Sequence, residues 1–318
     1  MKATRAGLVL PKPLQHRLEA AAAGLIQPKG WPQTDFAHPL GEPALTPPDS
    51  VSWQVFKNPV AILIGGMTAA ILELAEPRVR TGVWEHSSFR DHPMARLQRT
   101  GLATMMTVYG PRSHTEMVIA AVARMHGRVS GVTPDGQPYC ASDPDLLDWV
   151  HATASFGFLE AFNAYVRPVS DDERNRFYAE GMASARAYGA TGAPRSQAEL
   201  DALFDTMHER LEPSAIVLEF LQIMRNAPVL PGPLRPMQTL LIKAAVQITP
   251  AWVRERLGLD RRWNLRPWQR YLVKKTGQAA DRLLLSSSPA VQSCRRLGLP
   301  DDYLYGRLER QTWRAVDQ

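Results

Sequence analysis

Two histidines at helical spacing from apolar neighbours are residues that could do chemistry in this sequence. His126 lies one turn after Val122 and three residues before Val129, which places its side chain on the apolar face of a predicted helix. His151 shares an apolar stripe with Leu147 on another predicted helix. An inward imidazole can ligate a metal, although a hydrogen-bonded core histidine is commoner. Two such histidines on neighbouring helices indicate a ligand site more strongly than one.

A polar line accompanies the apolar stripe of the helix predicted over residues 92–109. Arg96 and Thr100 lie one turn apart on this line, and Arg99 lies beside them. Arginines on a helix usually form a solvated face, since charged side chains are mostly exposed. The functional alternative is a polar wall that faces a buried site.

Capping signals predict where the three helices of this region begin. Asp91 and Asp143 are expected N-caps, each followed closely by proline. Ser113 and Glu116 form the S-x-x-E pattern of a capping box, which predicts the start of the helix that carries His126. The P-D-G turn between the second and third helices predicts a connector, at most a small hairpin.

The most hydrophobic segment runs from Pro59 to Leu74 and predicts a buried central helix. About fourteen uncharged residues precede Glu73, fewer than the ~20 that a membrane span requires. Gly65 and Gly66 each cost ~1 kcal/mol in a helix, so something must offset them. Close packing of another helix is the simpler explanation, and contact with a flat ligand is the alternative.

Blocks between Pro59 and Gly192 resemble the characteristic blocks of the oxygenase family that contains fungal MpaB and the bacterial latex-clearing proteins. They include GGMTAAILELAEPRV, GVWEHSSF, DHPMARLQRT, MHGRVSG, GQPYCASDP and LLDWVHAT, in matching order. The resemblance implies an all-α fold, a single large helical domain whose globin-like core surrounds a haem pocket. It also implies b-type haem and oxidative cleavage of isoprenoid double bonds.

The resemblance implies roles for individual residues. The family's R-x-x-K-T motif falls on Arg96, Arg99 and Thr100, with arginine in place of lysine. The family lysine can ligate iron in a closed state, but a guanidinium has no free lone pair, so Arg99 cannot replace it. The family's iron-ligating histidine lies roughly thirty residues after the motif, which favours His126 and leaves His151 as the alternative.

Further roles follow from the same resemblance. Arg96 would hold a haem propionate or stabilise negative charge on reduced oxygen, and Thr100 would offer its hydroxyl to dioxygen. Glu85 is the expected counterpart of the family's catalytic glutamate. Gly65 and Gly66 join the histidines as expected cofactor contacts.

The sequence thus predicts a haem-dependent oxygenase that cleaves a C=C bond of an apolar, isoprenoid-like substrate with dioxygen. One alternative is a non-catalytic helical protein that binds a membrane surface or a partner. The arginine at position 99 favours this alternative. Another is a haem peroxidase-like enzyme.

Length and cysteine content bound the class of protein. The 318 residues, 45% of them hydrophobic, can bury a sizeable core. Cys140 and Cys294 are the only cysteines, so neither a disulfide framework nor a zinc site is expected, and a cytoplasmic location is the default. We expect an N-terminal helix and wrapping segment over 1–55, a catalytic core over 56–250 and a basic helical extension over 251–318.

The basic charge is concentrated after residue 250. This segment has fourteen Lys or Arg and seven Asp or Glu, and the first 250 residues carry a net charge of −1. Trp252, Trp263, Trp268 and Trp313 are interleaved with the cations. A solvated face whose tryptophans pack on the core is the simpler explanation. The functional one is reversible, peripheral contact with an anionic membrane; no nucleic-acid fold signature accompanies the charge.

Overall fold

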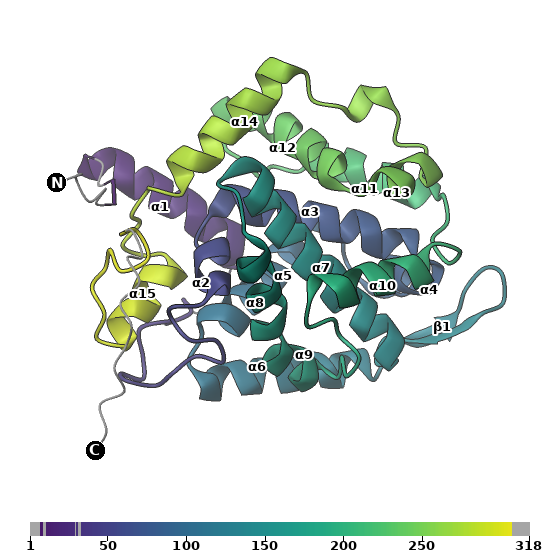
Figure 1. The fold of residues 1–318 in the computed structure, drawn as a ribbon, viewed down its shortest axis with the longest axis horizontal. Helices are drawn as coiled ribbons and strands as arrows, with labels where there is room; N and C mark the ends of the chain where they lie inside the picture. Colours follow the sequence, from purple (N-terminus) through teal and green to yellow (C-terminus); the bar gives the residue numbers. More distant parts are fainter. Residues whose placement is uncertain (1–6, 9–10, 29, 31–32, 307–318) are drawn as a thin grey trace.

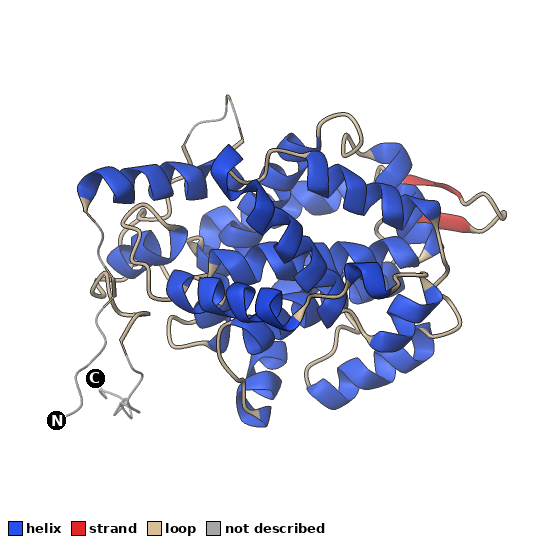
Figure 2. Cartoon of the chain, turned by 90° about the horizontal axis from the view of Figure 1, so that it is seen from above, coloured by secondary structure: helices blue, strands red, loops and turns tan. Residues whose placement is uncertain are grey.

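The computed structural model describes residues 7–8, 11–28, 30 and 33–306, and this part of the chain is almost entirely helical (Figures 1 and 2). The helices are α1 (Lys12–Ile26), α2 (Val51–Phe56), α3 (Pro59–Ala75), α4 (Pro77–His86), α5 (Pro93–Tyr109), α6 (Arg112–His126), α7 (Pro144–Tyr165), α8 (Asp171–Glu180), α9 (Met182–Tyr188), α10 (Gln197–Met207), α11 (Ala215–Asn226), α12 (Arg235–Ile248), α13 (Ala251–Arg256), α14 (Pro267–Ala280) and α15 (Pro289–Arg296), with 3-10 turns η1 (Gly232–Leu234) and η2 (Arg261–Trp263). The prediction of an all-α fold is confirmed, and the likeness to a globin core stays a prediction.

Helix α3 lies at the centre of the fold, as its hydrophobic sequence predicts. Asn58 caps it, because the Asn58 side chain accepts hydrogen bonds from the backbone N–H groups of Val60 and Ala61, each at 3.1 Å. Its most extensive contact is with α7, and α12 and α14 cover other parts of the pair. In Figure 1, α14 and α12 lie on one edge of the molecule and α6 and α9 on the opposite edge.

The two glycines of α3 have different surroundings. A Cβ at Gly65 would lie 2.6 Å from Phe158 Cα and 2.8 Å from the Gly157 carbonyl carbon, so α7 occupies the space that a ligand would need. Gly65 is therefore a helix-packing residue on the side that faces α7, and its expected role as a cofactor contact stays a prediction. Gly66 has open space, with only the Phe158 ring at 3.9 Å.

The end of α3 is set by Glu76, which caps α4. The Glu76 carboxylate accepts from the Val79 backbone N–H at 2.8 Å and pairs with Arg78 and Arg210, so this buried acid is fully satisfied. Among the described residues no single helix is long and apolar enough to cross a membrane. Only α3 and α4 together reach that length, and they are bent by 109° at their junction.

Two of the predicted helix starts require correction. His92, and not Asp91, is the N-cap residue of α5. Ser113 and Glu116 do not form a capping box, because α6 begins at Arg112. The Glu42 carboxylate accepts from the Ser113 backbone N–H at 2.6 Å and from its hydroxyl at 3.0 Å. Ser113 is thus hydrogen-bonded to a loop 71 residues earlier in the chain.

Other predicted boundaries are confirmed. Helix α7 starts after Asp143 and ends at Tyr165, as expected. The connector between α6 and α7 is a two-stranded antiparallel hairpin of β1 (Ser130–Val132) and β2 (Pro138–Cys140). The hairpin projects from one end of the molecule (Figures 1 and 2).

Candidate functional site

Four ionisable side chains from four helices are half-buried in the interior of the fold: Glu73 of α3, Arg96 of α5, His126 of α6 and His151 of α7. The charge of Arg96 acts on both Glu73 and His126, which places these three side chains in one cluster. The sequence predicts Arg96 and His126 as site residues. It did not lead us to Glu73.

Glu73 is an acid in an apolar environment. Burial raises the pKa of the Glu73 carboxyl to about 7, and the charge of Arg96 and a hydrogen bond from Thr153 only partly oppose this. The Thr153 hydroxyl donates to Glu73 Oε1 at 3.4 Å. A carboxyl whose pKa lies near neutral pH is present in both protonation states there, so Glu73 can accept or give a proton.

Arg96 is the cation of the cluster. Burial lowers the pKa of its guanidinium, and the nearby charge of Glu73 opposes that shift. An arginine nonetheless stays protonated in proteins. Arg96 Nη1 donates to the Thr100 hydroxyl, and that hydroxyl donates to the Arg96 carbonyl at 3.0 Å. These contacts hold Arg96 and Thr100, two of the three expected motif residues, against each other.

His126 carries a nitrogen with no partner. Its Nδ1 atom is buried, and no group among the residues that the structure describes forms a hydrogen bond with it. Burial and then the charge of Arg96 lower the pKa of His126, so the imidazole is neutral at pH 7. A neutral imidazole is the form that binds iron, and its second nitrogen ordinarily has an acceptor. His126 therefore fits the role of a haem ligand.

His151 of α7 lies next to the junction of α8 and α9. A Cβ at Gly181 would be 3.2 Å from His151 Nε2, so the ring packs closely against the chain there. Burial lowers the pKa of His151 to about 4, which keeps the ring neutral. Burial alone accounts for this shift, whereas the charge of Arg96 contributes to the shift of His126, so the packing role suits His151 better than the ligand role.

All four side chains keep accessible surface, and burial is the first cause of the pKa shift of each of them. Within the described residues, α5 packs mainly on α1, α2, α6 and α15 and approaches α3 and α7 only sparsely. The cluster of Glu73, Arg96 and His126 therefore joins α3 to α5 and α6 through charge and not through close backbone packing.

Two expected site residues lie at the periphery. Arg99 is exposed and donates to the Ser88 hydroxyl at 2.9 Å. Glu85 is exposed and accepts from the Tyr139 hydroxyl of the hairpin at 3.4 Å. The carboxylate that the structure places beside Arg96 is thus Glu73 and not Glu85. The sequence signal for Glu73 was present, since it is a lone acid within the most hydrophobic helix.

The described residues contain no group of three His, Cys, Asp or Glu side chains that could hold a bare metal ion. A haem supplies the equatorial ligands of its iron and needs one axial ligand from the protein. One neutral histidine, with a cation nearby to pair with a propionate, is consistent with haem. Such a pair does not suit a metal ion held by protein alone.

The helical fold and this site define a class of protein, mainly helical proteins with a half-buried polar cluster next to an apolar central helix. A family model described as "ER-bound oxygenase mpaB/B'/Rubber oxygenase, catalytic domain" matches residues 53–280, and the chain belongs to this family. The match includes Glu73, Arg96, His126 and His151 and extends through α14. Neither the curated proteins nor the solved structures gave a match. The family resemblance predicted from the sequence is confirmed.

Proposed function

We propose that the protein is a haem b-dependent oxygenase that cleaves a C=C bond of an apolar, isoprenoid-like substrate with dioxygen. Family membership supports an oxygenase that acts on a small molecule. The single observation that supports haem is the neutral, half-buried His126, whose buried Nδ1 has no partner among the described residues. In the overall reaction both oxygen atoms of dioxygen end in the two carbonyl groups formed from the broken double bond.

The chain itself would hold the cofactor with a few side chains. His126 would ligate the iron, and Arg96 would pair with a propionate or stabilise developing negative charge. When bound, the haem would supply the dioxygen chemistry that no side chain offers. The apolar side chains of α3 and α7 would exclude water from the haem site and bind an apolar substrate.

Glu73 would be the proton-transferring group of the site. Its pKa near 7 lets it accept a proton from substrate and return it at neutral pH. Thr153 fixes the carboxylate through its hydrogen bond, and Arg96 keeps a part of the charged form populated. Thr100, held against Arg96, would offer a second hydroxyl on the α5 side.

A peroxidase-like activity is the second enzymatic candidate, because a site with a histidine ligand and a nearby arginine also suits reaction with peroxide. The third candidate is a non-catalytic protein of the same fold. The observation in its favour is Arg99, which cannot ligate iron and lies exposed on α5.

A visible absorption spectrum separates these candidates. We expect the purified protein, or the protein mixed with haemin, to give a Soret band. His126→Ala should lose it, while His151→Ala should retain it and lose mainly stability. Product formation from an emulsified polyisoprenoid should require dioxygen and not peroxide. Colourless protein that does not take up haemin would refute the proposal. If His151→Ala bleaches the protein and His126→Ala does not, the ligand is His151.

A further inference from the structure

Helix α14 presents an apolar and aromatic stripe to solvent. Trp268 is 59% exposed, Tyr271 64% and Leu272 39%, and the spacing of these residues with Lys275 places all four on one helical face. Most large apolar side chains of this chain are buried, so an exposed stripe of this kind on a well-packed helix requires an explanation.

The opposite face fixes α14 rigidly to the core. A Cβ at Gly277 would lie 2.5 Å from the Tyr165 carbonyl oxygen of α7, and Val273 is fully buried. The Asn58 side chain donates to the Gly277 carbonyl at 2.9 Å. The stripe is therefore held outward by the packing of the other face and cannot turn inward.

Unpaired positive charge accompanies the stripe. The segment from 261 to 280 contains no Asp or Glu. Arg266, Arg270, Lys274 and Lys275 are exposed, and none of them forms an ion pair with a described carboxylate. Lys275 instead lies over the Tyr271 ring, 5.4 Å from its centroid.

Three other cations of the C-terminal segment have structural partners. Arg262 pairs with Asp260, and Arg295 pairs with Asp301. Arg296 is buried and donates to the carbonyl oxygens of Glu42, Phe36 and Tyr109. Arg261 and Arg282 are exposed without an ion pair, but they lie outside α14, so the largest group of free described cations in this segment is the one at α14.

The tryptophans divide in the same way. Trp252 stacks on His208, with ring centroids 4.6 Å apart, and Trp263 is half-buried against the core. Trp268 is exposed, and Trp313 lies outside the described residues. Packing on the core therefore explains two of the four tryptophans, and Trp268 belongs to the exposed stripe.

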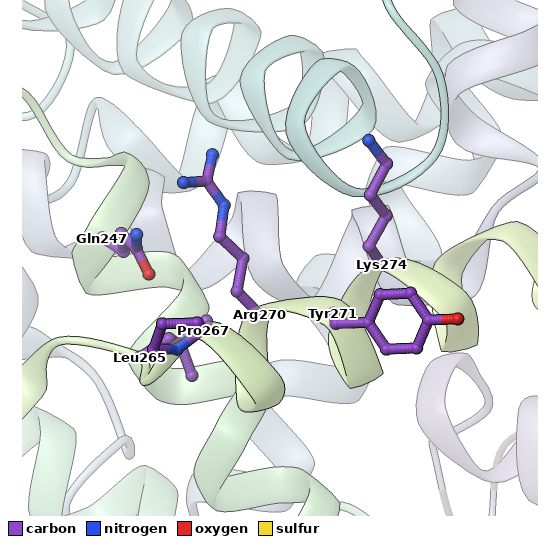
Figure 3. A pocket seen from close by; sticks show the side chains of 6 residues that line it. All are labelled: Gln247, Leu265, Pro267, Arg270, Tyr271 and Lys274. Carbon is purple, nitrogen blue, oxygen red and sulfur yellow. The ribbon is translucent and has the colours of Figure 1, made fainter.

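A pocket of about 360 Å³ lies beside the stripe. Its lining consists of Gln247, Leu265, Pro267, Arg270, Tyr271 and Lys274, so it has two cations and an amide but no carboxylate. Figure 3 shows the Arg270 and Lys274 side chains extending from α14 to the same side. Two convergent cations with a neutral hydrogen-bonding neighbour suit a phosphate group.

We propose that this face of α14 is a docking surface for an anionic phospholipid membrane. Trp268, Tyr271 and Leu272 would enter the boundary between headgroups and acyl chains, and the pocket of Arg270 and Lys274 would hold a lipid phosphate. A second copy of the chain does not suit this face, because it would bring four free cations against four others. Nucleic acid suits it less well, because Leu272 offers no stacking surface for a base.

The docking proposal rests on α14 alone and does not depend on haem. If both proposals hold, docking on the membrane would bring the haem site close to substrates that dissolve in lipid. Failure to bind haem would leave the docking surface unaffected, and failure to bind vesicles would leave the proposed chemistry unaffected.

Co-sedimentation of the full chain with vesicles tests the surface. We expect recovery with phosphatidylserine-containing vesicles, little with pure phosphatidylcholine vesicles, and release by salt. Arg270→Gln with Lys274→Gln should weaken binding about tenfold or more. The matched control is Arg128→Gln with Arg186→Gln, which removes the same charge from exposed positions on the α6–α9 edge and should leave binding unchanged.

Tryptophan fluorescence tests the depth of contact. We expect a blue shift on adding anionic vesicles, which Trp268→Phe should remove while vesicle binding persists. Circular dichroism checks that each variant is folded. Equal recovery in the supernatant with all vesicles would overturn the proposal. So would equal loss of binding in the control pair, or tighter binding to a single-stranded oligonucleotide than to anionic vesicles.

Discussion

The Thr153 hydroxyl of α7 donates a hydrogen bond of 3.4 Å to the Glu73 carboxylate of α3, and this bond links the two central helices at the candidate site. Glu73 has only this hydrogen bond and the charge of Arg96 to offset its burial. Glu76, one turn later on the chain, has two arginines and a backbone N–H. Glu76 thus has partners that offset its burial. Glu73 has fewer, and its pKa is raised to about 7.

Replacing Glu73 by Gln should change how stability depends on pH. The folded carboxyl has a pKa of about 7 against 4.5 ordinarily, so the folded state holds a proton that the unfolded state releases between these values. The stability contributed by neutral Glu73 is complete below pH 4.5 and is lost as the pH rises through 7. Glu73→Gln should match the wild type near pH ~4 and exceed it near pH ~8 by up to about 3 kcal/mol.

Urea unfolding at the two pH values measures this difference. Glu85→Gln is the control, because Glu85 is exposed and its replacement should give no pH-dependent change. If Glu73→Gln is less stable than the wild type at both pH values, Glu73 is ionised in the folded protein and pairs with Arg96.

His151 should make the protein sensitive to acid. Its pKa is about 4 when folded and 6.5 ordinarily, so the unfolded state binds the proton first as the pH falls. Stability is therefore lost between pH 6.5 and 4, by up to about 3 kcal/mol. His151→Gln, which stays neutral, should show a shallower loss in urea unfolding over this range. Parallel curves for the variant and the wild type would mean that the pKa of His151 is the same in the folded and unfolded states.

The two glycines of α3 should respond oppositely to alanine. Gly65→Ala would place a methyl group against the backbone of α7, and backbone cannot move aside as a side chain can, so we expect a loss of about 3 kcal/mol or more. Gly66→Ala meets open space and removes a helix-interior glycine, so it should gain about 0.5–1 kcal/mol. Thermal unfolding compares them directly. A stable Gly65→Ala variant would contradict the close packing of α3 on α7.

Arg99→Lys should alter the haem-loaded protein. The wild-type guanidinium has no free lone pair, so position 99 should not provide a second nitrogen ligand and one axial position should stay open. A lysine there offers an amine that can ligate when deprotonated, and we expect a visible spectrum that changes with rising pH. Arg99→Gln is the control, because it also loses the guanidinium but carries no amine. A wild-type spectrum with two protein nitrogen ligands would contradict the open position.

Local sequence determined much of the architecture. The apolar run from Pro59 predicted the central helix, and Asp143 and the P-D-G turn marked boundaries that the structure keeps. These signals are reliable because caps, prolines and turns act over a few residues, so their effect needs no knowledge of the rest of the fold. The family blocks likewise predicted the oxygenase family that the family model confirms.

Only the tertiary structure decided which side chains meet. Helical periodicity placed His126 and Arg96 on particular faces, but it could not show that Glu73 and not Glu85 lies beside Arg96, because that depends on how α3 and α5 are arranged in space. The same holds for Ser113, whose partner Glu42 is 71 residues away. It holds for the basic segment too, where long-range packing buries Arg296 and leaves the cations of α14 free. A sequence reports the face on which a side chain lies, and the packing of helices decides what that face meets.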